Sequence, residues 1–238
     1  MTSPKRINRP CHWIPTRYAQ SPAVIFQSAI RERLASDMAI LDVGSGRRPA
    51  LSKDELNGLR YVGLDVSATE LTAAPEGTYG ETFVTDVASR VAELVDEFEL
   101  IVSWQVLEHV KDIAAALENM RAYLRPGGQL VAMLSGTFSV HGILNKLIPG
   151  SLGVRLMRDL LGRDPSSVFP AYYDRCHYRA LVRLLEPWGW ATVMPFYQAG
   201  AYFDFSHLLR RAYFTYEDWA WRTGRANLAT HYLIVARR

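Results

Sequence analysis

The chain has 238 residues, of which 49% are hydrophobic, and its 27 basic and 24 acidic side chains leave a formal net charge of +3. A chain of this length can hold a core without disulfides, so we expect a single domain over residues 1–238. The weak charge gives no reason to expect a nucleic-acid partner. Cys11 and Cys176 are the only cysteines and lack metal-ligand spacing. This disfavours a disulfide framework and a zinc site and favours a reducing cytoplasm, while dependence on another metal stays open.

The N-terminal part predicts a helix rather than a membrane segment. No apolar run approaches the roughly 18 residues that a spanning helix requires, and no apolar segment follows the polar start, so neither spanning nor export is expected. Residues 1–36 are predicted to be a helical segment, because apolar side chains recur near helical spacing at Ile25, Phe26, Ala29, Ile30 and Leu34.

The next hundred residues alternate between predicted strands and helices. Short apolar runs predict strands at 38–43, 61–66, 82–85, 100–104 and 129–134. Segments that can be helical follow the first four runs, and Pro49 suits the first position of the first of these helices. The run from Arg125 to Gly128 is expected to end the last helix. Repeated strand and helix units predict a parallel sheet with helical crossovers.

Residues 136–177 are predicted to be an insertion between two parts of the core, 37–135 and 178–238. Later patterns predict a helix at 178–185, strands at 190–196 and 230–236, and a helix at 205–221. Within the insertion, apolar and basic residues at helical spacing indicate an amphipathic helical pair, interrupted at Pro149. We expect a cap that closes the active site or a contact in a homodimer, with a peripheral membrane contact as the alternative.

Glycines and carboxylates fall where successive predicted strands end. Gly44 and Gly46 follow the first strand, Asp65 ends the second and Asp86 ends the third. In an open parallel sheet these ends meet at one edge, where ligands bind. The order of these residues favours an adenosine ligand, with Asp65 accepting hydrogen bonds from ribose hydroxyls and Asp86 accepting from an exocyclic amine. A dinucleotide is disfavoured, because Pro49 replaces the third glycine of that fingerprint.

Five short motifs follow one another between Ile40 and Leu134: Leu-Asp-Val-Gly-Ser-Gly at 41–46, Gly-Leu-Asp-Val-Ser at 63–67, Val-Thr-Asp-Val at 84–87, Ser-Trp-Gln-Val-Leu-Glu-His-Val at 103–110 and Leu-Arg-Pro-Gly-Gly at 124–128. Through these motifs the region resembles class I S-adenosylmethionine-dependent methyltransferases. Arg48 departs from the pattern, since many relatives have a third glycine there. The resemblance implies a Rossmann-like, doubly wound α/β fold with seven strands, mostly parallel with an antiparallel last strand, plus the helical cap insertion.

The resemblance also implies a cofactor site. S-adenosylmethionine would be the methyl donor and S-adenosylhomocysteine the product. The residues implied to contact the cofactor are Asp42, Gly44, Ser45, Gly46, Asp65, Val66, Asp86, Val87, Ser103, Trp104 and Gln105.

Three histidines are candidates for the base that a hydroxyl acceptor needs. His109 is the leading candidate, and His141 and His177 are weaker ones; each also has a structural interpretation as a packing or surface residue. Glu108, Tyr172 and Tyr173 are candidates for contact with the acceptor, although paired loop tyrosines also serve as anchors.

The sequence thus favours O-methylation of a small molecule such as a sugar, a glycolipid precursor or a natural product. No Asn-Pro-Pro-Tyr-like motif follows the fourth strand, which by the resemblance disfavours amide or nucleobase nitrogen as acceptor. C- or N-methylation and a catalytically silent adenosyl-binding module remain alternatives.

Overall fold

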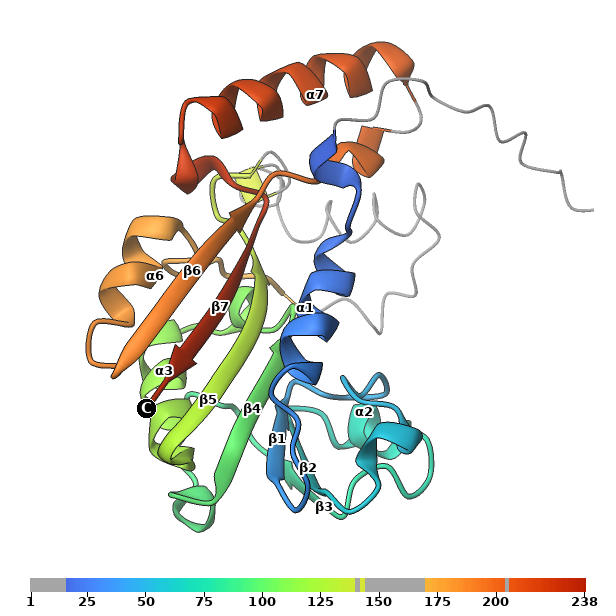
Figure 1. The fold of residues 1–238 in the computed structure, drawn as a ribbon, viewed down its shortest axis with the longest axis vertical. Coiled ribbons are helices and arrows are strands. Elements are labelled where there is room, and N and C mark those ends of the chain that lie inside the picture. Colours follow the sequence, from blue (N-terminus) through green and yellow to red (C-terminus); the bar gives the residue numbers. More distant parts are fainter. Residues whose placement is uncertain (1–15, 140–141, 144–169, 204–205) are drawn as a thin grey trace, which may run out of the picture.

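The computed structural model describes residues 16–139, 142–143, 170–203 and 206–238, which form one α/β unit (Figure 1). Its seven strands are β1 (Ala39–Val43), β2 (Arg60–Asp65), β3 (Glu81–Val84), β4 (Phe98–Trp104), β5 (Leu124–Ser135), β6 (Trp190–Phe196) and β7 (His231–Arg237). They lie in the order β3-β2-β1-β4-β5-β7-β6, and β7 is antiparallel to both of its neighbours. The predicted fold class is confirmed. The cap at 136–177 stays a prediction, since most of it lies outside the described residues.

The helices cover both faces of the sheet (Figure 1). They are α1 (Pro22–Arg31), α2 (Ala68–Thr72), α3 (Ile113–Tyr123), α6 (Tyr178–Leu184) and α7 (His207–Arg222). Short 3₁₀ turns occur at η1 (Thr16–Tyr18), η2 (Lys53–Leu56), η3 (Ala92–Leu94), η4 (Leu107–His109), η6 (Gly200–Phe203) and η7 (Ala226–Leu228). In the part of the chain that the structure describes, no helix has the length and apolar character to cross a bilayer.

Two helix boundaries differ from the sequence predictions for local reasons. The first helix begins at Pro22, three residues before Ile25, the first apolar residue of its pattern, because Ser21 accepts a hydrogen bond from the Val24 N–H and proline suits the first helical position. The prediction of a helix that starts at Pro49 is wrong, because the segment between β1 and β2 contains only the 3₁₀ turn η2. Glu55 accepts hydrogen bonds from the Ser52 N–H and hydroxyl at 2.9 and 2.7 Å, so this short helix starts at Lys53.

Strand β5 begins five residues before its predicted start. The Arg-Pro-Gly-Gly run does end α3, but it lies inside the strand as an irregularity. Phe98 pairs with Leu124 and Leu100 pairs with Gln129, so the register shifts between them. A Cβ on Gly128 would lie 2.9 Å from the carbonyl oxygen of Phe98, so only glycine fits this close approach.

The core consists of two apolar layers, one on each face of the sheet. Successive strand residues point to opposite faces, so Leu41 packs in the layer that includes α3, and Ile40 packs in the layer that includes α1. Phe26 of α1 and Met120 of α3 are both about fully buried. Helix α7 lies beyond the edge at which β5 and β6 end (Figure 1).

Asp42 is a buried carboxylate in the middle of this apolar environment. It is 2% exposed, accepts a hydrogen bond from the Ala50 N–H at 2.8 Å and accepts a second from the Tyr61 hydroxyl. Burial raises the pKa of Asp42 to about 6, although these two hydrogen bonds oppose the rise. The carboxylate therefore fixes the loop after β1 at a cost in solvation.

Replacing Asp42 with asparagine should change how stability depends on pH. The fold raises the pKa of Asp42 from 3.8 to about 6, so its favourable contribution is complete below about pH 4 and is lost as pH rises through about 6. This difference between the two pKa values corresponds to about 3 kcal/mol of stability. We expect the free energy of unfolding of Asp42→Asn, relative to wild type, to rise by up to about 3 kcal/mol between about pH 4 and pH 7. Urea denaturation of both proteins at each pH measures this difference in the free energy of unfolding. A difference that stays the same from about pH 4 to pH 7 would contradict the prediction.

Candidate functional site

The turn after β1 has a backbone that glycine permits. Gly44 has a φ of 71° and Gly46 a φ of 43°, both in the left-handed region. A Cβ on Gly44 would lie 2.1 Å from Cγ2 of Val106, and one on Gly46 would lie 3.4 Å from Oδ2 of Asp65. The turn therefore brings the ends of three strands, β1, β2 and β4, into contact.

Asp65 ends β2 beside this turn. The Ser67 N–H donates to its Oδ1 at 2.9 Å, and the N–H groups of Gly46 and Val66 also donate to the carboxylate. Burial raises the pKa of Asp65, while these backbone donors oppose the rise. Val66, by contrast, is 57% exposed. The structure thus brings Asp65 and Gly46 together, as the sequence predicts.

Two predicted site residues lie beneath the turn. Ser45 is 4% exposed, and its hydroxyl lies 3.1 Å from the place of a Cβ on Gly63. Asp42 is buried on Tyr61, as described above. The Tyr79 hydroxyl donates to the Gly46 carbonyl oxygen at 3.3 Å. The Tyr79 ring stacks on the ring of Tyr61, with the two ring centroids 5.3 Å apart. These side chains support the turn more than they line its surface.

The end of β3 only partly matches its prediction. Asp86 is exposed and accepts a hydrogen bond from the Ala88 N–H at 2.9 Å. The Val87 side chain is 3% exposed and packs in the core, and its carbonyl oxygen accepts from Asn119 at 3.0 Å. The resemblance implies that Val87 contacts the cofactor, but the apolar core already buries most of its side chain.

The strand order reverses between β1 and β4, which is where ligands bind in such sheets. Ser103 pairs with Val43 across this point and is 1% exposed, and among the described residues its hydroxyl has no hydrogen-bond partner. Trp104 is 38% exposed, with its ring 4.9 Å from that of Phe26. Gln105 has a φ of 55°, an uncommon backbone conformation for a residue other than glycine.

A polar cluster joins the ends of β4 and β5. The Ser135 hydroxyl donates to Oε1 of Gln105 at 2.6 Å, and the Ser135 N–H donates to Oε1 of Glu108 at 3.2 Å. Glu108 is 2% exposed, and its Oε2 has no hydrogen-bond partner within the described parts of the chain. Burial raises the pKa of Glu108, and nearby His109 partly offsets this.

His109 has a defined tautomer when neutral. Its Nδ1 lies 3.1 Å from the carbonyl oxygen of Pro170, which can only accept, so Nδ1 must carry the proton. The Nε2 lone pair then remains available to accept a proton. This is the chemistry that a general base requires.

The end of the predicted insertion lies against this histidine. The N–H groups of Tyr172 and Tyr173 donate to the Glu108 carbonyl oxygen at 2.9 and 3.0 Å. Tyr173 is 4% exposed and belongs to the core, whereas Tyr172 is 42% exposed, with Nζ of Lys111 5.4 Å from its ring centroid. Of the two, Tyr172 is the one that can contact an acceptor.

The two weaker histidine candidates are not brought into the cluster. The His177 ring lies 5.1 Å from that of Phe138, and the residue directly precedes α6. His141 lies outside the described residues. Among the residues that are described, no group of three or more His, Cys, Asp or Glu side chains could hold a metal ion.

Sequence reasoning missed Val106 and Ser135. Val106 packs on Gly44, and Ser135 connects Gln105 with Glu108. The position of Ser135 directly after the predicted fifth strand was a usable signal, because it shares the sheet edge with the other candidates. Nothing local in the sequence pairs Val106 with Gly44, since that contact depends on the packing of β4 beside β1.

Comparisons with known proteins agree with this geometry. The family model described as "Methyltransferase domain" matches residues 12–231. A ubiquinone biosynthesis O-methyltransferase of Chelativorans sp. (strain BNC1) is 30% identical over 111 residues, which cover 44% of each chain. Its counterpart in Brucella ovis is 25% identical over 145 residues, covering 57% of this chain and 58% of that protein. The similarity therefore spans about half the length of these relatives.

Solved structures share the fold at low identity. A SAM-dependent methyltransferase from Archaeoglobus fulgidus has a TM-score of 0.55 and 14% identity, covering 91% of this chain and 94% of that chain. Phosphoethanolamine N-methyltransferase 2 of Haemonchus contortus, in complex with S-adenosyl-L-methionine, has a TM-score of 0.54 and 14% identity, covering 89% and 52%. With the family model matching most of its length, this chain belongs to the methyltransferase domain family, whose cofactor is S-adenosylmethionine.

Proposed function

We propose that the protein transfers a methyl group from S-adenosylmethionine to an oxygen atom of a small molecule such as a sugar, a glycolipid precursor or a natural product. The observation that carries this proposal is the contact between the glycine turn after β1 and Asp65, next to the polar cluster at the ends of β4 and β5. The O-methyltransferase names of the curated relatives support oxygen as the acceptor atom.

Each strand end has a proposed role toward the cofactor. Asp65 accepts hydrogen bonds from the ribose hydroxyls, and the turn at Gly44 and Gly46 borders the methionine part. Exposed Asp86 accepts from the adenine amine. Ser103 and Trp104, at the end of β4, and Gln105, directly after it, line the cleft that holds the cofactor.

Methyl transfer requires alignment and one proton acceptor. The acceptor oxygen attacks the methyl carbon, the bond from carbon to sulfur breaks with its electrons going to sulfur, and S-adenosylhomocysteine leaves. The hydroxyl proton moves to Nε2 of His109, whose Nδ1 is held by Pro170. Glu108 then stabilises the positively charged ring, since its buried carboxyl group interacts electrostatically with His109.

Removing the Asp65 carboxylate should weaken cofactor binding. Hydrogen bonds to a charged group contribute about 1.5–3 kcal/mol, so we expect Asp65→Ala to raise the Kd for S-adenosylmethionine at least about tenfold in calorimetry. Glu118→Ala, which removes an exposed carboxylate on α3, is the control and should bind as wild type does. Equal affinities in all three proteins, with folding checked by circular dichroism, would refute the assignment.

The acceptor atom can be identified by isotope transfer. We expect label from methyl-labelled S-adenosylmethionine to enter a component of fractionated metabolites or glycans and to appear in an ether by mass spectrometry. A methyl group on nitrogen or carbon would replace the oxygen assignment with the corresponding alternative. Cofactor binding without transfer to any fraction would instead indicate a silent adenosyl-binding module.

Once a product is known, His109→Ala tests the base. General-base catalysis contributes about 10²–10⁴-fold, so we expect kcat to fall by at least about 10²-fold while the KM for the acceptor changes little. His207→Ala, at the exposed start of α7, is the matched control. An unchanged single-turnover rate in His109→Ala would show that another group takes the proton.

A further inference from the structure

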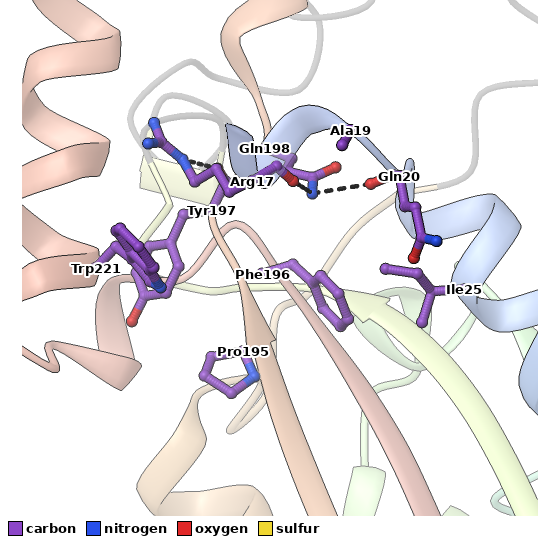
Figure 2. Close-up of a pocket in the computed structure, with 9 residues that line it drawn as sticks. All are labelled: Arg17, Ala19, Gln20, Ile25, Pro195, Phe196, Tyr197, Gln198 and Trp221. Atoms are coloured by element: carbon purple, nitrogen blue, oxygen red, sulfur yellow. Dashed lines mark hydrogen bonds between the residues drawn. The ribbon is translucent and has the colours of Figure 1, made fainter. Parts of the chain in front are cut away.

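A separate hollow lies between η1, the end of β6 and α7. Its volume is about 310 Å³, and its lining includes Arg17, Gln20, Ile25, Phe196, Gln198 and Trp221 (Figure 2). None of these residues belongs to the cofactor side of the site. The hollow is formed by three segments that are far apart in the sequence.

A buried carboxylate fixes the walls of this pocket. Glu217 of α7 is 1% exposed and accepts hydrogen bonds from the Ala199 N–H at 2.8 Å, from Arg17 at 3.2 Å and from the Tyr18 hydroxyl. Arg17 also donates through Nε to the Tyr197 carbonyl oxygen at 2.9 Å. The three segments are thus tied together without a ligand, so the pocket is preformed.

The lining favours a neutral ligand. The guanidinium of Arg17 pairs with both Glu217 and Asp218, so it leaves no unpaired positive charge for an anionic ligand. The remaining polar groups include two amides, and Nε2 of Gln198 donates to the Gln20 carbonyl oxygen at 3.0 Å (Figure 2). Phe196 and Trp221 add aromatic surface, and Trp221 is 52% exposed. Aromatic surface with amide groups suits a ring that carries hydroxyls.

The register of the sheet relates this pocket to the polar cluster. His231 of β7 pairs with Ser135 on one side and with Phe196 on the other. Ser135 and Phe196 therefore lie at the same level of the sheet, two strand spacings or about 10 Å apart. The residues that line the pocket do not include His109 or the residues that contact it, so we assign a ring in the pocket to a part of the acceptor other than the group methylated at His109.

We propose that the pocket binds a neutral, hydroxyl-bearing six-membered ring of the acceptor, either a pyranose or a phenol, at a distance from the methylated atom. The assignment of the ring to the acceptor rests on the proposed function, whereas the pocket itself does not. Ring binding here would select acceptors with at least two linked groups. It would act mainly on acceptor affinity, because it does not touch the reacting atoms.

Binding of two probes tests the proposal. Methyl α-glucopyranoside and phenol are titrated separately by saturation-transfer NMR against the full chain, and we expect at least one to bind. Trp221→Ala should raise the Kd of that probe about tenfold, as expected for the loss of one aromatic contact. Trp190→Ala is the control, because Trp190 is also 52% exposed but lies at the opposite end of β6. Which probe binds distinguishes the two ring types.

The outcomes separate this proposal from the proposed function. If neither probe binds, or if Trp221→Ala and Trp190→Ala behave alike, the pocket proposal is overturned. Gln20→Ala gives a second variant that removes only an exposed amide, and it should also weaken the probe. S-adenosylmethionine affinity, measured in parallel, should stay as in wild type in all variants. Probe binding in a protein that does not bind the cofactor would overturn methyl transfer and leave the pocket intact.

Discussion

The arrangement of the site depends on the close approach of three strand ends around the turn after β1. Gly44 leaves no room for a Cβ, because Val106 occupies that space, and Gly46 lies against the Asp65 carboxylate. Both glycines have positive φ angles, which L side chains adopt only with strain. If this turn were wider, Asp65 and the residues after β4 would not share one edge of the sheet, and neither cofactor nor acceptor could lie between them.

The fold supports this turn with buried polar groups that are individually unfavourable. Asp42 is almost fully buried and is held by Ala50 and Tyr61, at the cost that its raised pKa reflects. Asp65 is likewise desolvated but has backbone donors from the turn itself. Such groups restrict the loop to one geometry. We interpret them as stability given up for a preorganised site.

The other half of the sheet carries the acceptor side of the proposed reaction. Ser135 connects Gln105 and Glu108 at the ends of β4 and β5, and the antiparallel β7 places Phe196 at the same level. Glu217 then holds η1 against α7 and the segment after β6. In the proposed reaction the two polar clusters serve two different tasks: one lies beside His109, the proposed base, and the other fixes the pocket between η1, β6 and α7.

The sequence by itself determined the fold class, the position of every strand except the start of β5 to within two residues, and the strand-end residues Gly44, Gly46 and Asp65. It could do so because buried parallel strands, glycine turns and strand-end carboxylates are local patterns. Only the tertiary structure decided which of the candidates meet. It buried Val87 and Tyr173, left Asp86 and Tyr172 exposed, and put Ser135 beside Glu108. These outcomes depend on packing between strands and loops that are distant in the chain, and no local pattern records such contacts.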